Sequence, residues 1–224
     1  MAKIALSDLT EEQLLEIVSL DEKRIAHYDW LDVDHISLSA EEQMAINIIK
    51  TRLLQDETGL MNEATMWSRG IYPLLVLAEQ GDIRAWVEVA LAAKYGETDL
   101  SGTADGVLAT VIAGIVRTPY LVTVEAKRTL ESKNPRIQFY GQLLVAATSN
   151  WQKQQTDITE IFGCYTIADI WSFARVTIQG LSTSQSDTEK PQMVVEISRE
   201  YIERMEAETI LKILKNIVSR SHII

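Results

Sequence analysis

The feature that most constrains how this chain can fold is an apolar run, residues 120–124, which is followed at once by Glu125, Ala126 and Lys127. The run is Tyr-Leu-Val-Thr-Val, and this β-branched and aromatic composition is typical of a buried β-strand. Because side chains alternate along a strand, Glu125 and Lys127 project from the same face. Two charged groups at the end of a buried strand are tolerated when they pair with each other or bind a metal ion. The run therefore predicts a buried strand with a polar site at its carboxyl end.

A second carboxylate, that of Asp105, stands near the start of another β-rich run. Together with Glu125 it offers the hard oxygen ligands that Mg²⁺ or Mn²⁺ prefers, and such sites leave positions for water and a phosphate oxygen. A divalent cation activates a phosphodiester and a water molecule for hydrolysis. Lys127 can orient the attacking water and stabilise the charge that develops on the phosphate. The helix expected next carries Gln138 and Gln142 on one face, where either could contact the water, Lys127 or a phosphate.

The rest of the sequence alternates between helical and strand patterns. A Ser-Ala-Glu-Glu motif at Ser39 is typical of a helix start, and Pro135 suits the first turn of a helix. Arg117, Thr118 and Pro119 are expected to form a turn between two strands. We expect helices over residues 7–27, 39–56, 62–77 and 134–151 and a last helix that ends near 219, and strands over 83–93, 102–114, 120–126, 160–167, 170–179 and 193–197. This order predicts a single α/β (α+β) domain with a mixed central sheet flanked by helices.

Taken in order, these residues resemble the PD-(D/E)xK, or restriction-endonuclease-like, nuclease superfamily. The similarity covers roughly residues 62–178 and rests on Asp105, on the Glu-Ala-Lys strand end and on Gln138 in the next helix. The proline that names the motif is absent before the aspartate, where Ala104 stands. The resemblance implies a restriction-endonuclease-like fold and a metal-dependent nuclease.

Two flanking segments are similar to the N-terminal nuclease module of type I restriction subunits. One extends from Asn62 to Leu75, where Glu63 matches an active-site glutamate on the first helix. The other carries a Gly-x-x-Thr … Trp-x-Phe hairpin pattern at residues 163–173. We therefore expect one domain with three parts, of which only the core is covered by the resemblance. These are residues 1–60 as an N-terminal helical extension, 61–180 as the nuclease-like core, and 181–224 as a loop, a short strand and a C-terminal helix that packs on the core.

The resemblance also implies roles for individual residues. The chain would be an endonuclease-like hydrolase that acts on DNA with Mg²⁺ or Mn²⁺. Asp105 and Glu125 would bind the metal, and the catalytic residues would be Asp105, Glu125, Lys127, Gln138 and Glu63. The residues that contact nucleic acid would be Arg128, Arg136 and Gln142. A homodimer would suit cleavage of both strands of a duplex, because two sites related by symmetry are then required.

Net charge leaves other interpretations open. A charge of −11 argues against a nucleic-acid partner. The charge is uneven, however, because residues 117–153 hold six basic residues and two acidic ones, which is compatible with a local basic face. The charged strand end could be a structural salt bridge. The chain could also be an inactive nuclease-fold protein that binds nucleic acid or serves in protein assembly, or an acidic protein whose helices bind another protein.

Several further classes of protein are disfavoured. Cys164 is the only cysteine, so no internal disulfide can form and a reducing, cytoplasmic compartment is expected. Acidic residues appear too early for a signal peptide, and the apolar runs are too short to span a membrane. The three histidines show no metal-ligand spacing. The chain has no Gly-x-x-x-x-Gly-Lys loop, which argues against nucleotide hydrolysis.

Overall fold

The computed structural model describes residues 2–127, 135–181 and 190–220. The strands within them are β1 (Ala2–Ala5), β2 (Ser19–Glu22), β3 (Ile83–Tyr95), β4 (Thr98–Ile112), β5 (Ile115–Lys127), β6 (Ile158–Ile167), β7 (Ile170–Gln179) and β8 (Gln192–Ile202). They form one eight-stranded sheet in the order β1-β4-β5-β6-β7-β8-β2, with β3 paired to β4. The pairs β1–β4, β5–β6 and β2–β8 are parallel, and the other neighbours are antiparallel. The expected mixed sheet is confirmed.

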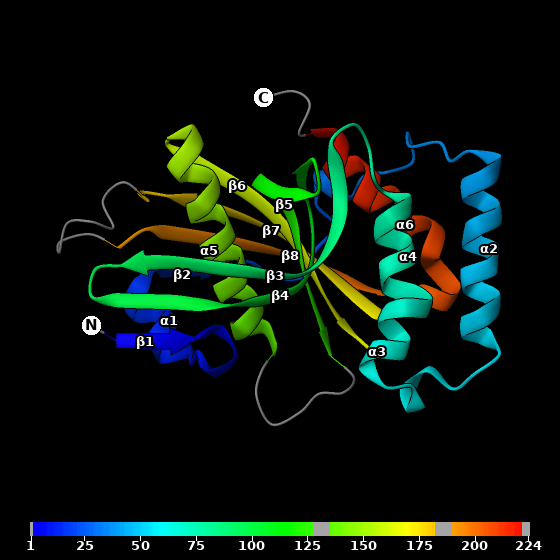
Figure 1. Ribbon diagram of the computed structural model, residues 1–224, viewed down its shortest axis with the longest axis horizontal. Coiled ribbons are helices and arrows are strands. Elements are labelled where there is room, and N and C mark those ends of the chain that lie inside the picture. The colour runs from blue at the N-terminus through cyan, green and yellow to red at the C-terminus, as the bar shows by residue number, and fades with distance from the viewer. Residues whose placement is uncertain (1, 128–134, 182–189, 221–224) are drawn as a thin grey trace.

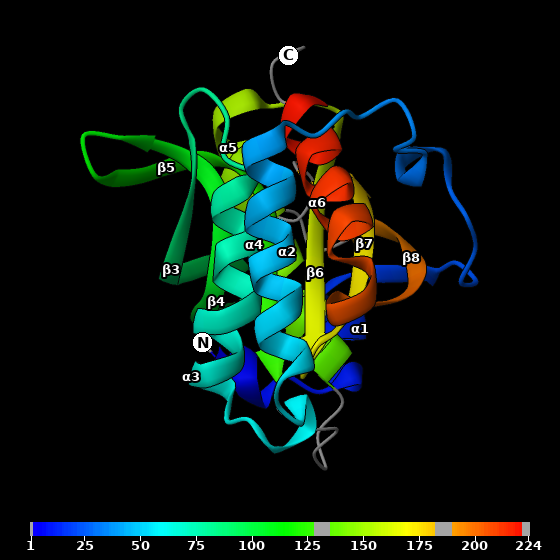
Figure 2. The same cartoon turned by 90° about the vertical axis from the view of Figure 1, so that its right-hand side faces the viewer.

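Helices cover both faces of this sheet, as Figures 1 and 2 show. The helical segments are η1 (Leu6–Asp8), α1 (Glu11–Ile17), η2 (Asp29–Leu31), α2 (Ala40–Leu54), η3 (Thr58–Leu60), α3 (Glu63–Met66), the π-helical turn η4 (Trp67–Ile71), α4 (Tyr72–Leu77), α5 (Pro135–Gln154) and α6 (Glu203–Arg220). In the two views α2, α4 and α6 lie over one face, and α1 and α5 lie over the other. Over the described ranges, no helix has the length and apolarity needed to span a membrane.

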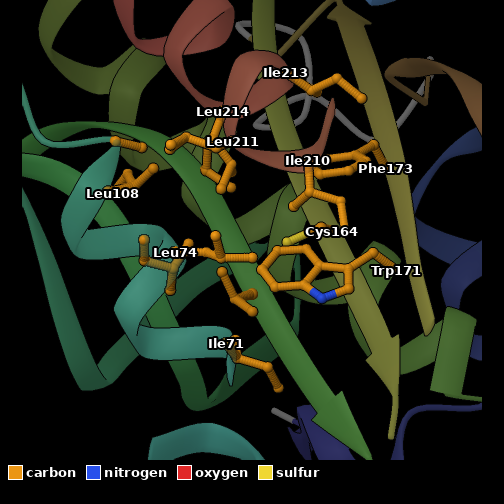
Figure 3. Packing of buried hydrophobic residues seen from close by; sticks show 14 of the residues in the cluster. Ile71, Leu74, Leu108, Cys164, Trp171, Phe173, Ile210, Leu211, Ile213 and Leu214 are labelled. Carbon is orange, nitrogen blue, oxygen red and sulfur yellow. The ribbon is translucent and has the colours of Figure 1, made fainter. Parts of the chain in front are cut away.

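One hydrophobic core lies between the sheet and the helices α2, α4 and α6. Figure 3 shows Leu74 of α4 and Ile210 of α6 facing Trp171 and Phe173 of β7, with Cys164 of β6 beside them. Cys164 is buried and free, as expected for a small hydrophobic residue. Each buried leucine or phenylalanine contributes roughly 1.5–3 kcal/mol relative to an exposed one. Many such contacts fix these helices on this face of the sheet.

A second core lies between the opposite face of the sheet and α5. Leu6 of η1 enters this core beside two glycines, because a β-carbon on either Gly102 of β4 or Gly141 of α5 would come within 2.8 Å of its side chain. Gly163 of β6 gives similar room to Phe139 of α5, whose ring lies 2.6 Å from the position of a β-carbon. Leu6 therefore anchors the N-terminal segment in the packed interior.

β3 changes the face on which it packs at Glu88. Ile83 and Ala85 belong to the core beneath α4, whereas Val89 and Leu91, which continue the same alternation, belong to the core beneath α5. Glu88 has a φ of +51°, a backbone region that residues other than glycine seldom adopt. This conformation rotates the strand, so the two halves of β3 contribute to different cores.

Several expected elements are confirmed. Ser39 caps α2 in a capping box with Glu42, and α5 begins at Pro135. β6 and β7 form the expected hairpin. The last helix, α6, reaches Arg220. Capping motifs and long amphipathic patterns act locally, which is why they could be found in the sequence.

The N-terminal third differs from the expectation of a helical extension. The helix expected over residues 7–27 ends at Ile17, and Ser19–Glu22 forms β2. β2 pairs in parallel with β8, whose free backbone groups offer a partner that only the folded sheet provides. The segment also supplies β1, so it contributes both short strands at the two ends of the sheet order.

Two interruptions also differ from their expected places. The turn expected at residues 117–119 lies inside β5, next to a bulge in its pairing with β4, and the chain turns instead at Ala113 and Gly114, which both have positive φ. The helix expected over 62–77 passes through the π-helical turn η4, and Pro73 lies at the start of α4, where a proline is tolerated.

Candidate active site

The candidate site lies where β4 and β5 separate. Their pairing ends at Gly106 and Val124, whereas β5 stays paired with β6 as far as Lys127. The backbone N–H of Ala126, just beyond the last β4 pair, donates to Oδ2 of Asp105 at 2.7 Å. A buried N–H needs a hydrogen-bond acceptor. Here the acceptor is Asp105, and the bond fixes its carboxylate at the strand end.

The carboxylate of Glu125 is enclosed by protein, with 0% of the residue exposed. Nζ of Lys127 lies 2.7 Å from its Oε1. Gln142 of α5 donates from Nε2 to Oε2 of Glu125 at 2.5 Å and to the carbonyl oxygen of Thr103 at 3.4 Å. One carboxylate oxygen of Glu125 is therefore paired with Lys127 of the same strand, and the other accepts a hydrogen bond from Gln142 of α5.

The two carboxyl groups have raised pKa values. Burial raises the pKa of Glu125 to about 7, and the charge of Asp105 adds to the shift. The bonds from Lys127 and Gln142 act in the opposite direction without cancelling it. Burial also raises the pKa of Asp105, against the N–H bond from Ala126 and the charge of Lys127. A carboxyl pair of this kind takes up a proton near neutral pH unless a cation compensates its charge.

Lys127 remains an ammonium group in this setting. Its side chain is 31% exposed, and burial acts to lower its pKa. The bond to Glu125 and the charges of Asp105 and Glu63 outweigh burial, so that the pKa of Lys127 is raised. Since Glu63 acts on this pKa, the start of α3 brings the predicted glutamate within electrostatic range of the strand end.

Glu88 is an acidic neighbour that the sequence patterns did not single out. The residues on either side of it pair with the residues on either side of Asp105, so Glu88 stands opposite Asp105. Its charge adds to the rise in the Asp105 pKa. The two-residue turn at Gly96 and Glu97 sets this register, because Tyr95 pairs with Thr98 next to it. Pairing residues outward from that turn in the sequence would have placed Glu88 opposite Asp105.

The other expected site residues are placed differently. Gln138 is half-buried on α5 and makes no hydrogen bond within the described residues. Gln142, expected to contact nucleic acid, is fully buried at the site. Arg136 pairs with Glu22 of β2. Arg128 lies outside the described residues.

Three side chains here carry oxygen atoms that could bind a divalent cation. Asp105 and Glu125 supply carboxylates, and Oε1 of Gln142 is a buried amide oxygen with no hydrogen-bond partner among the described residues. Mg²⁺ commonly takes one or two carboxylates and completes its coordination with water and substrate phosphate. In the described part of the chain, no three His, Cys, Asp or Glu side chains are grouped to hold a metal ion.

The arrangement combines three chemical capacities at one strand end: a carboxyl pair, an ammonium donor and a fixed amide. Comparison with known protein families and with curated proteins finds no match to this chain. The capacities of the site are therefore inferred from its geometry and charges.

Proposed function

We propose that this chain is a metal-dependent phosphodiester hydrolase that acts on DNA, with a PD-(D/E)xK site in a restriction-endonuclease-like core. The observation that carries the proposal is the fully buried Glu125 carboxylate, held between Lys127 and Gln142 and beside Asp105. Burying two carboxylates together is unfavourable unless a proton or an opposite charge is bound. Lys127 supplies one positive charge, and a divalent cation would compensate the rest.

Each residue then has a role that follows from its contacts. Asp105 and Glu125 would hold Mg²⁺ or Mn²⁺, which supplies polarisation of the phosphodiester and activation of water. The Ala126 N–H fixes the Asp105 carboxylate, and Gln142 fixes that of Glu125. Nζ of Lys127, partly exposed, donates to the attacking water or to a phosphate oxygen.

Glu63 and Gln138 lie at the edges of this site. Glu63 acts through Lys127, whose positive charge it supports. Gln138 is half-buried one helical turn before Gln142 and is proposed to contact the substrate rather than the carboxylates. A homodimer that brings two such sites to one duplex remains part of the proposal.

Cleavage of supercoiled and linear DNA with Mg²⁺ or Mn²⁺ tests the proposal. Lys127→Ala should lower the cleavage rate about 10²–10³-fold, because it removes a donor aimed at developing charge. Lys94→Ala on exposed β3 is the matched control and should leave the rate unchanged. Equal activity of wild type and Lys127→Ala would show that the strand end is not the catalytic site.

Metal binding is tested separately from activity. Mg²⁺ should raise the melting temperature of the wild type, because a cation bound only by the folded state stabilises it. Asp105→Asn should lose this rise, whereas Asp99→Asn, on the same strand but away from the site, should keep it.

A second candidate is a nuclease-fold protein without catalysis that binds nucleic acid or assembles with other proteins. The net charge of −11 favours the form of this candidate that assembles with other proteins, because an acidic molecule repels DNA. The absence of cleavage with either metal, together with no metal-dependent rise in melting temperature, would support this candidate. DNA binding that weakens with salt in the same protein would identify it as a nucleic-acid-binding module.

A further inference from the structure

The first turns of α5 carry a pair of donors that converge on a carboxylate from the N-terminal segment. Arg136 forms an ion pair with Oε1 of Glu22. The hydroxyl of Tyr140, one turn later, donates to the same oxygen at 2.9 Å. Arg136 also donates to that hydroxyl at 3.1 Å, and its guanidinium lies 5.9 Å from the centre of the Tyr140 ring. Two donors on one helix therefore hold a single anionic oxygen.

The position of Glu22 follows from the alternation of β2. Asp21 alternates with Glu22 along β2 and forms an ion pair at 2.6 Å with Lys23, which follows the strand. The Glu22 side chain reaches from β2 to Arg136 and Tyr140 of α5. Burial raises the pKa of Tyr140, so its hydroxyl remains a donor at neutral pH.

The chemistry of the pair suits a phosphate as well as a carboxylate. A guanidinium and a hydroxyl that meet at one anionic oxygen can bind a phosphodiester through charge-assisted bonds. The side chains of Arg136 and Glu22 are 37% and 36% exposed, so a ligand can reach the ion pair from solvent. Arg136 is on the same helix as Gln142, which holds Glu125. A phosphate bound here would thus lie along the helix that contacts the candidate active site.

The source of the carboxylate is also informative. Residues 1–60 contain 13 acidic and 5 basic residues, so this segment carries much of the net negative charge of the molecule. The segment is tied to the sheet through β1 and β2 and places one of its carboxylates on Arg136. The segment can therefore compete, through Glu22, with an anionic ligand for Arg136.

We infer that Arg136 and Tyr140 form a binding site for a backbone phosphate of the nucleic-acid substrate, and that Glu22 occupies this site in the free protein. The inference rests on the proposed function, since it places a substrate phosphate beyond the scissile one. Binding of nucleic acid displaces Glu22 from Arg136. The free energy needed to break this ion pair reduces the affinity for the substrate. Glu22 therefore limits binding to ligands that offer Arg136 a better anion.

Binding of a short fluorescently labelled DNA duplex tests this inference, measured by anisotropy in EDTA so that no cleavage occurs. Glu22→Gln should bind about fivefold tighter than wild type, because no ion pair with Arg136 has to be broken before the phosphate binds. The log–log salt slope should stay about the same, because both proteins form the same phosphate contacts once DNA is bound. Asp21→Asn changes net charge by the same amount on the same strand and should change affinity less than twofold. The gain should disappear in Glu22→Gln/Arg136→Ala.

The outcomes separate the inference from the proposed function. Equal gains in Glu22→Gln and Asp21→Asn would mean that only net charge matters, and would overturn the inference. A gain that survives Arg136→Ala, or no DNA binding by Glu22→Gln at all, would overturn it too. The proposed function is judged independently by the metal-dependent rise in melting temperature and its loss in Asp105→Asn. Melting curves of all variants without metal show whether each one is folded.

Discussion

The carboxyl group of Glu125 is shielded from water and lies beside a second carboxyl, that of Asp105. Its pKa rises from an ordinary value of 4.5 to about 7 because of burial and that neighbouring charge. Between these values the folded state binds more protons than the unfolded state. The free energy of unfolding therefore falls as pH increases through this window, and the contribution is lost once pH exceeds about 7.

Denaturant unfolding between pH 5 and pH 8 measures this contribution. Relative to Glu125→Gln, the wild type should lose on the order of 2 kcal/mol over the window, because glutamine stays neutral at every pH. Glu203 also has a raised pKa, so the informative quantity is the difference between the two proteins. Mg²⁺ should reduce the loss, since it replaces the proton in the folded state. Parallel pH profiles for wild type and Glu125→Gln would contradict a raised Glu125 pKa.

At this scale the sequence predicted what depends on strand alternation. Glu125 and Lys127 share a face and touch, because a period of two fixes their directions. The choice between Gln138 and Gln142 depended on how α5 is rotated over the sheet, and the structure places Gln142 on the carboxylate. Glu88 was missed because its closeness to Asp105 arises from a hairpin register rather than from any local pattern.

At the scale of elements, the π-helical turn η4 brings the backbone of Gly70 against the side chain of Glu203 at the start of α6. Glu203 is fully buried and accepts a hydrogen bond from Nε1 of Trp171 at 2.8 Å. Burial raises its pKa to about 8, so the carboxyl is largely protonated near neutral pH. A β-carbon at Gly70 would overlap Oε1 of Glu203. The bond to Trp171 and the surrounding core leave that oxygen little room to move.

Gly70→Ala should therefore lower the free energy of unfolding by about 2 kcal/mol, the range typical of overpacking in a buried site. Gly59→Ala is the matched control, because a β-carbon at Gly59 meets nothing within 4 Å and the residue is exposed. That variant should stay within about 0.5 kcal/mol of wild type. Urea unfolding measures both.

A double variant tests the cause of the Gly70 effect. If Glu203 is the obstacle, Gly70→Ala should cost less in a Glu203→Ala background than in wild type, because contacting residues are not additive. Equal costs in the two backgrounds would point to the π-helical backbone itself rather than to the carboxyl. The comparison thus distinguishes a packing effect from a backbone effect.

Elements with strong local signals were predicted well. Ser39 and Pro135 mark helix starts through capping and fixed φ, which act within a few residues. The helix expected over residues 7–27 stopped at Ile17 because β8 offered backbone partners to the following segment. Pro119 was expected in a turn, but its segment is accommodated at a bulge in β5. Both differences arise from contacts between segments far apart in the sequence.

At the scale of the whole molecule, the N-terminal segment holds the sheet at two places. β1 pairs with β4 at one end of the strand order, and β2 pairs with β8 at the other. The same segment places Leu6 in the core beneath α5 and Glu22 on Arg136. The order of elements in the sequence predicted the α/β class. It could not predict that an early segment closes both ends of the sheet, because that pairing depends on the finished fold.

Leu6→Ala tests whether the N-terminal segment and the later core unfold together. Leu6 is buried against Gly102 and Gly141, so its removal leaves a cavity that two glycines cannot fill. The free energy of unfolding should fall by about 3 kcal/mol, and unfolding should remain a single transition, because the segment shares its core with α5. Leu60→Ala, at an exposed leucine of η3, should change it by less than about 0.5 kcal/mol. A separate early transition in Leu6→Ala, followed by unchanged unfolding of the remainder, would instead show that residues 1–60 unfold separately from the rest of the protein. A single shifted transition would mean that residues 1–60 and the rest of the protein unfold as one cooperative unit. Glu22 would then leave Arg136 by a local movement of its side chain, without unfolding of the segment that carries it.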